Sequence, residues 1–168
     1  VTWEQCFTSV EALMRIKDAS DQIVLLNTFI NVAEKNGMII RLGEIVFEKV
    51  CGFLQENHPK QLGLHYIEVN LSAVQCTYEH LAESFIRIME QYEIDPSWVN
   101  LEITESASVS SKKIFLENIR KLMDYGITFS LDDFGTGQSN LNYIVEMPVN
   151  IVKFDRSMIS AYFENGKA

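Results

Sequence analysis

The chain has 168 residues, 47% of them hydrophobic, which is enough to bury one core and too little for two ordinary domains. Its formal charge of −9, with no cluster of Lys and Arg, argues against a nucleic-acid polymer as partner. No apolar run approaches the roughly 20 residues that span a bilayer, and the first residues lack the pattern of a signal peptide, so no direct membrane insertion is expected.

Short apolar segments alternate along the chain with segments of helical period, which predicts a parallel sheet with helical crossovers in one domain. The predicted elements, in chain order, are strand Thr8–Leu13, helices Phe29–Glu34 and Glu44–Gln55, strand Tyr66–Leu71, helix Tyr78–Tyr92, strand Val99–Thr104, helix Lys112–Tyr125, and strands Ile127–Leu131 and Val149–Phe154. Gly37 and Gly126 are predicted to end the helices that precede them.

The predicted strands have one apolar and one polar face. Ile67 and Val69, for example, alternate with Glu68 and Asn70. The apolar face suits a cover of helices, and the active site of a parallel barrel lies at the C-terminal ends of its strands. A complete barrel takes about 250 residues, so five strands indicate either a smaller open sheet or a barrel that lacks some of its units.

The three cysteines are far apart and form no C-x-x-C pair. They are Cys6, Cys51 and Cys76. An odd number at this spacing argues against a disulfide framework and against a zinc site. We therefore expect buried, reduced thiols and a cytoplasmic protein, although its parent could be tethered to a membrane.

Six polar side chains stand at or near the C-terminal ends of the predicted strands: Glu11, Asn70, Glu102, Asp132, Asp133 and Lys153. Five of them offer the hard oxygen ligands that suit Mg²⁺, Mn²⁺ or Ca²⁺. Each alone could be a solvated edge residue or part of a turn. Their shared position at strand ends makes a site for two metals and a phosphodiester the better interpretation.

The neighbours of these residues add two expectations. Arg15 follows the first strand and could reach an anionic ligand, and Gly135-Thr136-Gly137 predicts a tight loop over the site. With these residues, the chain resembles the EAL domain family over nearly its whole length. The similarity is carried, in the family's order, by Glu11-Ala12-Leu13 with Arg15, Asn70-Leu71-Ser72, Leu101-Glu102-Ile103-Thr104-Glu105-Ser106, Asp132-Asp133-Phe134-Gly135-Thr136-Gly137 and Lys153-Phe154-Asp155-Arg156-Ser157.

EAL domains are TIM-like barrels that hydrolyse the bacterial messenger cyclic di-GMP to a linear dinucleotide with Mg²⁺ or Mn²⁺. The resemblance implies that residues 1–168 form an incomplete EAL-type phosphodiesterase domain. Its expected fold is α/β, a partial TIM-like (β/α) barrel with parallel strands that lacks its last βα units. Two ions would be bound by Glu11, Asn70, Glu102, Asp132 and Asp133.

The same resemblance implies individual roles. Glu11, Asp132 and Lys153 would be catalytic, with Lys153 orienting the attacking water, and Arg15, Leu13 and Asp133 would contact the substrate. The loop from Asp133 to Asn140 would connect metal binding to a homodimer. The residues expected to support the site from this loop and from the third strand are Glu105, Phe134, Gly135, Thr136 and Gly137.

The chain also departs from the family pattern. Ile16 replaces the usual Trp, and Lys17–Asp21 replaces a turn that helps to grip a guanine base. The family's first strand before Val1, its next catalytic glutamate and a later glutamine strand are expected to be missing. We therefore expect weak or no activity from this chain alone, and a sensor or GGDEF domain is a further expected partner in the parent protein.

Two other functions fit the same fold. The first is a receptor that binds cyclic di-GMP without cleaving it, which the changed segment Ile16–Asp21 favours. The second is a protein-interaction module that has lost the ligand. The complete acidic set argues against the second, because an interaction surface does not need buried carboxylates.

Overall fold

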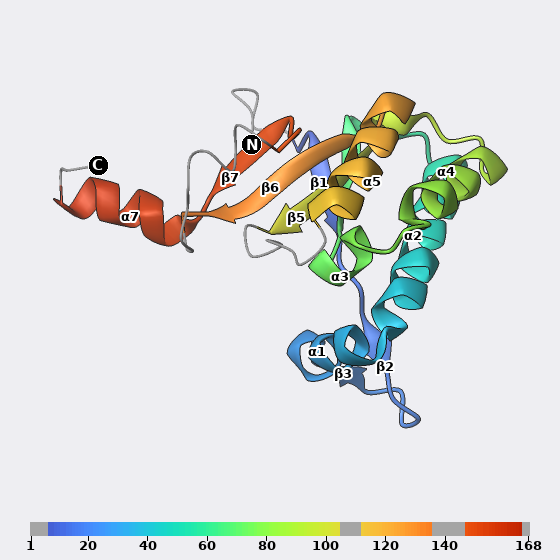
Figure 1. The fold of residues 1–168 in the computed structure, drawn as a ribbon, viewed down its shortest axis with the longest axis horizontal. Helices are drawn as coiled ribbons and strands as arrows, with labels where there is room; N and C mark the ends of the chain where they lie inside the picture. The colour runs from blue at the N-terminus through green and yellow to red at the C-terminus, as the bar shows by residue number, and fades with distance from the viewer. Residues whose placement is uncertain (1–6, 105–111, 136–146, 166–168) are drawn as a thin grey trace.

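The computed structural model describes residues 7–104, 112–135 and 147–165. Five parallel strands form a curled half-barrel in the order β1-β4-β5-β6-β7 (Figure 1). These strands are β1 (Ser9–Ala12), β4 (Tyr66–Asn70), β5 (Val99–Thr104), β6 (Thr128–Phe134) and β7 (Ile151–Phe154). The predicted parallel sheet is thus confirmed, with each predicted strand within a few residues of its observed bounds.

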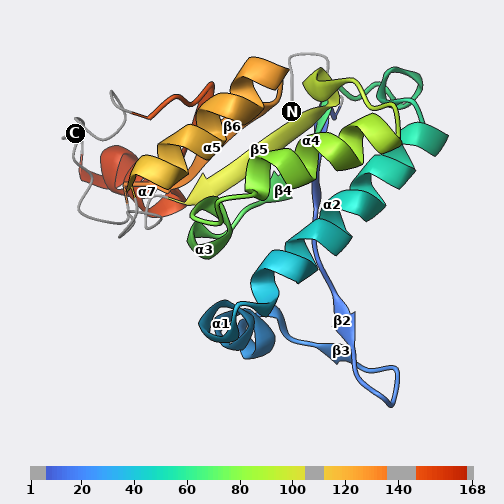
Figure 2. The same ribbon diagram turned by 45° about the vertical axis from the view of Figure 1, so that its right-hand side comes forward.

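Helices cover the outer face of this sheet (Figure 2). The covering helices are α2 (Met38–Glu56), α4 (Leu81–Gln91) and α5 (Lys112–Tyr125). Val69, Leu101 and Phe129 are buried against them in one continuous core. The burial of alternate residues follows from the two-residue period of a strand, so the polar residues between them face the inside of the half-barrel.

A smaller unit lies apart from the sheet, at the bottom of Figure 1. It consists of helix α1 (Leu26–Asn36) and an antiparallel hairpin of β2 (Ile16–Lys17) and β3 (Ile23–Val24). Gly37 separates α1 from α2 with a φ of 77° and donates its N–H to the carbonyl of Glu34, which confirms the predicted helix end. The hairpin was not predicted, because strands of two residues have no measurable period.

Strand β6 is longer than the sequence predicts. It continues past Leu131 to Phe134, and the pairing with β7 shifts in register between these two residues. Phe134, expected in a loop, is instead the buried last residue of the strand, and its ring contacts that of Phe154 with centroids 5.8 Å apart. This aromatic contact explains why the strand continues beyond its apolar segment.

The remaining elements are short or lie at the end of the sheet. Three short helical segments connect the larger elements: η1 (Pro59–Leu62), α3 (Ala73–Cys76) and η2 (Pro96–Trp98). Helix α7 (Arg156–Asn165) follows β7 and extends away from the sheet (Figure 1). Among the described helices, none combines the length and the apolar character needed to cross a membrane.

Gly43 in α2 lies directly against the start of α3. The Gln75 side chain accepts the Ser72 backbone N–H while the Ser72 hydroxyl accepts the Gln75 N–H, which forms a capping box. A Cβ added at Gly43 would lie 1.7 Å from Gln75 Nε2. Any larger residue at position 43 would therefore require the Gln75 side chain to move out of this close contact.

We expect Gly43→Ala to destabilise the protein, although alanine favours a helix interior by about 1 kcal/mol over glycine. The added methyl group would push Gln75 out of the capping box, and the loss of a cap costs roughly 0.5–2 kcal/mol, with a further penalty for the displaced buried amide. Gly52→Ala is the matched control in the same helix, because its Cβ would lie 3.6 Å from the Tyr92 ring. Urea unfolding of both variants is the measurement, and equal stability would contradict the prediction.

Candidate functional site

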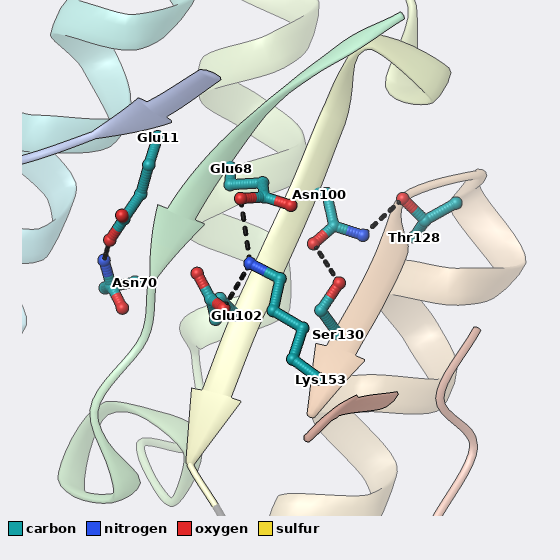
Figure 3. A network of polar contacts seen from close by, with 8 residues as sticks. All are labelled: Glu11, Glu68, Asn70, Asn100, Glu102, Thr128, Ser130 and Lys153. Carbon is teal, nitrogen blue, oxygen red and sulfur yellow. Dashed lines mark hydrogen bonds and ion pairs between the residues drawn. The ribbon is translucent and has the colours of Figure 1, made fainter. Parts of the chain in front are cut away.

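The inner face of the half-barrel carries buried polar side chains on neighbouring strands. Glu68, Asn100, Glu102 and Ser130 are all buried there. Asn100 accepts a hydrogen bond from the Ser130 hydroxyl at 2.7 Å and donates one to the Thr128 hydroxyl at 2.9 Å (Figure 3). Within the described ranges, every buried side-chain nitrogen or oxygen has a hydrogen-bond partner. The buried polar side chains of the inner face are therefore hydrogen-bonded, as burial of such groups requires.

Lys153 of β7 is the centre of this face, because it reaches across the sheet to β4 and β5 (Figure 3). Its Nζ donates to Glu68 Oε2 at 2.9 Å and to Glu102 Oε1 at 2.5 Å. The Glu102 side chain is only 3% exposed and that of Glu68 11%, whereas Lys153 is 32% exposed. One ammonium thus compensates two carboxylates that have little access to water.

The pKa values at this contact reflect opposing causes. Burial raises the pKa of Glu102, the bond to Lys153 offsets this only in part, and the charges of Asp132 and Glu68 raise it further. Burial by itself would lower the pKa of Lys153, but the bonds to Glu102 and Glu68 outweigh it and raise the pKa. Glu68, Glu102 and the nearby Asp132 thus supply three carboxylates to one ammonium, an arrangement that a further cation would stabilise.

A second contact joins β1 to β4. Asn70 Nδ2 donates a hydrogen bond to Glu11 Oε1 at 2.5 Å, and both side chains are exposed (Figure 3). The register pairs Glu11 with Glu68 and Asn70 with Glu102, so the predicted residues of β1, β4 and β5 occupy adjacent positions. The structure thus brings together Glu11, Asn70 and Glu102 as the sequence predicts.

The two aspartates at the end of β6 occupy different environments. Asp132 is half-buried and pairs in register with Thr104, whereas Asp133 is exposed with a φ of 54°. The pKa of Asp133 is raised by partial burial and then by the charges of Asp132 and Asp155. The left-handed backbone and the register shift give adjacent residues different surroundings, as expected for neighbours that one strand cannot direct to the same side.

A cavity of about 580 Å³ adjoins this end of the sheet, and Glu11, Leu13, Arg15 and Asn70 contribute to its lining. Its volume is within the range of roughly 300–1,000 Å³ that small-molecule sites usually have. The Arg15 side chain is exposed, and its Nη1 donates to the carbonyl of Met14 at 2.8 Å. Arg15 therefore remains able to bond an anionic ligand through its other nitrogens.

The donors of the site fit a hard divalent cation in kind. They are carboxylates and one amide, the ligands that Mg²⁺ and Mn²⁺ prefer. Across the described ranges, however, no three His, Cys, Asp or Glu side chains stand close enough together to hold a metal ion. Glu11 is bonded to Asn70 and Glu102 to Lys153. Each of these contacts engages one oxygen of the carboxylate, so a cation could share the carboxylates with Asn70 and Lys153 or replace these partners.

Three of the residues that the sequence predicts to support the site lie outside the described residues. They are Glu105, Thr136 and Gly137. Gly135 directly follows β6 with a φ of 104°, and a Cβ there would lie 2.5 Å from Met158 Sδ of α7. Sequence reasoning did not include Glu68 in the site, although its position two residues before Asn70 on the same strand face was the available signal.

Comparisons with known proteins agree on one family. The family model described as the EAL domain matches residues 2–168. The chain is 33% identical over 155 residues to the bifunctional diguanylate cyclase/cyclic di-GMP phosphodiesterase MucR of Pseudomonas aeruginosa, covering 90% of this chain and 22% of MucR. It is 31% identical over 150 residues to the cyclic di-GMP phosphodiesterase NbdA of the same organism, covering 89% of this chain and 19% of NbdA.

Solved structures give the same result. The PaMucR phosphodiesterase in complex with c-di-GMP has a TM-score of 0.77 and 32% sequence identity, covering 90% of this chain and 64% of that one. The chain therefore spans about a fifth of the length of the two relatives named above and less than two thirds of this solved domain. The match to a larger barrel-like domain confirms the predicted partial TIM-like barrel.

Proposed function

Because this chain belongs to the EAL domain family, we propose that it takes part in the hydrolysis of cyclic di-GMP to a linear dinucleotide. The observation that carries the proposal is the set of two carboxylates and one amide, from Glu11, Glu102 and Asn70, on adjacent strands. Glu11 and Asn70 line a cavity together with Arg15. The similarity to relatives that are named cyclic di-GMP phosphodiesterases supports the proposal. In this proposal, residues 1–168 act as a single EAL-type unit.

We further propose that the reaction depends on two Mg²⁺ or Mn²⁺ ions. Their ligands would be Glu11, Asn70, Glu102, Asp132 and Asp133, which all offer oxygen. When bound, such a pair of ions stabilises the negative charge that develops on the attacking and leaving oxygens of a phosphodiester. The two carboxylates of Glu68 and Glu102, which share the single ammonium of Lys153, support a cation at this position.

The chain's own residues would orient the substrate and the water. Arg15 would donate to a phosphate oxygen and Leu13 would pack on the ligand, since both line the cavity. Lys153, a donor with three N–H groups, would orient the attacking water. Attack in line forms one P–O bond and breaks another, and the ribose 3′-oxygen leaves with a proton.

The direct test is to incubate the complete gene product with cyclic di-GMP and either metal, and to separate the products by chromatography. We expect a linear dinucleotide that does not form in the presence of a chelator. No product at high protein concentration would refute the proposal, and calorimetry that shows tight, metal-independent binding without turnover would identify a receptor instead. The isolated chain is expected to show weak activity or none.

Arg15→Ala is expected to weaken cyclic di-GMP binding by about ten- to a hundredfold, because a hydrogen bond to a charged group is worth roughly 1.5–3 kcal/mol. Isothermal titration calorimetry in metal-free buffer, where turnover is not expected, measures the dissociation constant. Arg120→Ala, which removes an exposed arginine from α5 on the outer face, is the control for net charge. Equal effects of the two substitutions would remove Arg15 from the site.

A further inference from the structure

Glu68 has no role in the proposed set of cation ligands, yet it is one of the few buried carboxylates of the half-barrel. It lies on the inner face of β4, and its side chain is 11% exposed. Its Oε2 accepts a hydrogen bond from Lys153 Nζ at 2.9 Å, and the same ammonium contacts Glu102 at 2.5 Å (Figure 3). Two carboxylates therefore compete for one ammonium.

We propose that Glu68 is a positioning residue that keeps the Lys153 ammonium on the inner face when Glu102 binds a divalent cation. This inference rests on the proposed metal-dependent function. Without the cation, the ammonium contacts both Glu102 and Glu68. With the cation bound, it would be held by Glu68 alone. Lys153 would then remain available at the site instead of turning out to water.

The electrostatics of the contact support this exchange. A divalent cation bound to Glu102 would neutralise the carboxylate charge that now attracts Lys153. Its positive charge would also repel the ammonium. A partly buried ammonium without a counter-ion is strongly disfavoured, so Lys153 must find another partner or move to solvent. The Lys153 side chain is 32% exposed, so its ammonium can reach solvent. Glu68, already in contact, provides the alternative partner without any large movement.

The strands beside Glu68 and Lys153 carry other charged and polar groups. Asp132 of β6 acts on Glu102, and its charge raises the pKa of that carboxylate. Asn100 of β5, in register with Glu68, is occupied with Thr128 and Ser130. In the described part of the chain, Lys153 Nζ forms ion pairs with Glu68 and Glu102. When Glu102 is taken by a cation, Glu68 is therefore the carboxylate already in place.

Nitrogen-detected NMR of lysine ammonium groups tests the proposal without measuring activity. A hydrogen-bonded, protected ammonium gives an observable signal, and Lys153→Arg identifies the one that belongs to Lys153. In wild-type protein we expect this signal before Mg²⁺ addition and, shifted but retained, at Mg²⁺ saturation. In Glu68→Gln we expect the signal without Mg²⁺, since Glu102 still holds the ammonium, and its loss once Mg²⁺ is bound.

Two further variants complete the experiment. Glu68→Asp keeps the negative charge, so the Lys153 ammonium signal that is lost in Glu68→Gln should be present at Mg²⁺ saturation. A merely structural role of Glu68 does not predict this difference between the two variants. Glu83→Gln removes the exposed partner of Lys121 on another element and should leave the Lys153 signal unchanged. Loss of the wild-type signal with Mg²⁺, or its retention in Glu68→Gln, would overturn the proposal. If Mg²⁺ shifts no signal at Asn70 or Glu102, the proposed metal dependence fails, and this proposal fails with it.

Discussion

If the proposed hydrolysis of cyclic di-GMP is correct, a Glu102→Gln variant of the complete gene product is expected to lose at least about a hundredfold of this activity while it remains folded. Substitution of residues that only support metal ligands commonly reduces activity or affinity about 10–100-fold, so loss of a direct ligand should exceed that range. Glutamine has the same shape as glutamate but no charge, and it is a weaker ligand for a hard cation. Steady-state hydrolysis at saturating Mg²⁺ is the measurement.

The stability of the same variant separates this role from a structural one. Breaking a buried ion pair can cost roughly 3–5 kcal/mol when a charge is left alone. Lys153 keeps the charged carboxylate of Glu68 as its partner in this variant. We therefore expect only a small change in the urea midpoint. Glu117→Gln, at an exposed position on α5, should retain full activity, and an active Glu102→Gln protein would exclude the proposed ligand role.

The largest effect on stability is expected from Phe85→Ala, which should lower the free energy of unfolding by about 3–5 kcal/mol. Phe85 of α4 stacks on Phe47 of α2, with ring centroids 3.9 Å apart and an angle of 11° between the rings. Both rings are almost completely buried in the core. Removal of one ring leaves a cavity between two helices that cannot collapse without moving the helices themselves.

Phe163→Ala is the matched control for this substitution. Phe163 lies in α7 with 78% of its surface exposed, so its loss should change the free energy of unfolding by less than about 0.5 kcal/mol. Urea unfolding followed by circular dichroism gives both values. If Phe85→Ala unfolds with the wild-type midpoint, the contact between α2 and α4 contributes little, and the helical layer must be held by other residues.

Much of the fold could be predicted because the strands of this protein have a simple pattern. In β4 and β5 every second residue is apolar, and that period alone determines which side chains meet the helices. Glu11, Asn70 and Glu102 stand on the other face near the ends of parallel strands, so their proximity follows from the topology once the strand order is known. The period also predicted α5 with its observed bounds.

Other features depend on information that a local pattern does not contain. The reach of Lys153 across two strands to Glu68 depends on the curl of the sheet and on side-chain length, neither of which has a sequence period. The extension of β6 to Phe134 depends on the distant ring of Phe154. The β2–β3 hairpin closes through local bonds, in which Asp18 Oδ1 accepts the N–H groups of Ser20 and Gln22.

The strand registers also imply an order in which the molecule assembles. Leu101 pairs with Phe129, a short distance along the chain, whereas Ser9 must find Tyr66 across the longest of the connections between paired strands. Closing a longer loop costs more chain entropy, so β4, β5 and β6 are expected to come together before β1 joins them. Glu11 arrives with β1. We therefore expect a newly synthesised chain to form the β4, β5 and β6 part of the core first and to complete the cavity that Glu11 lines when β1 docks.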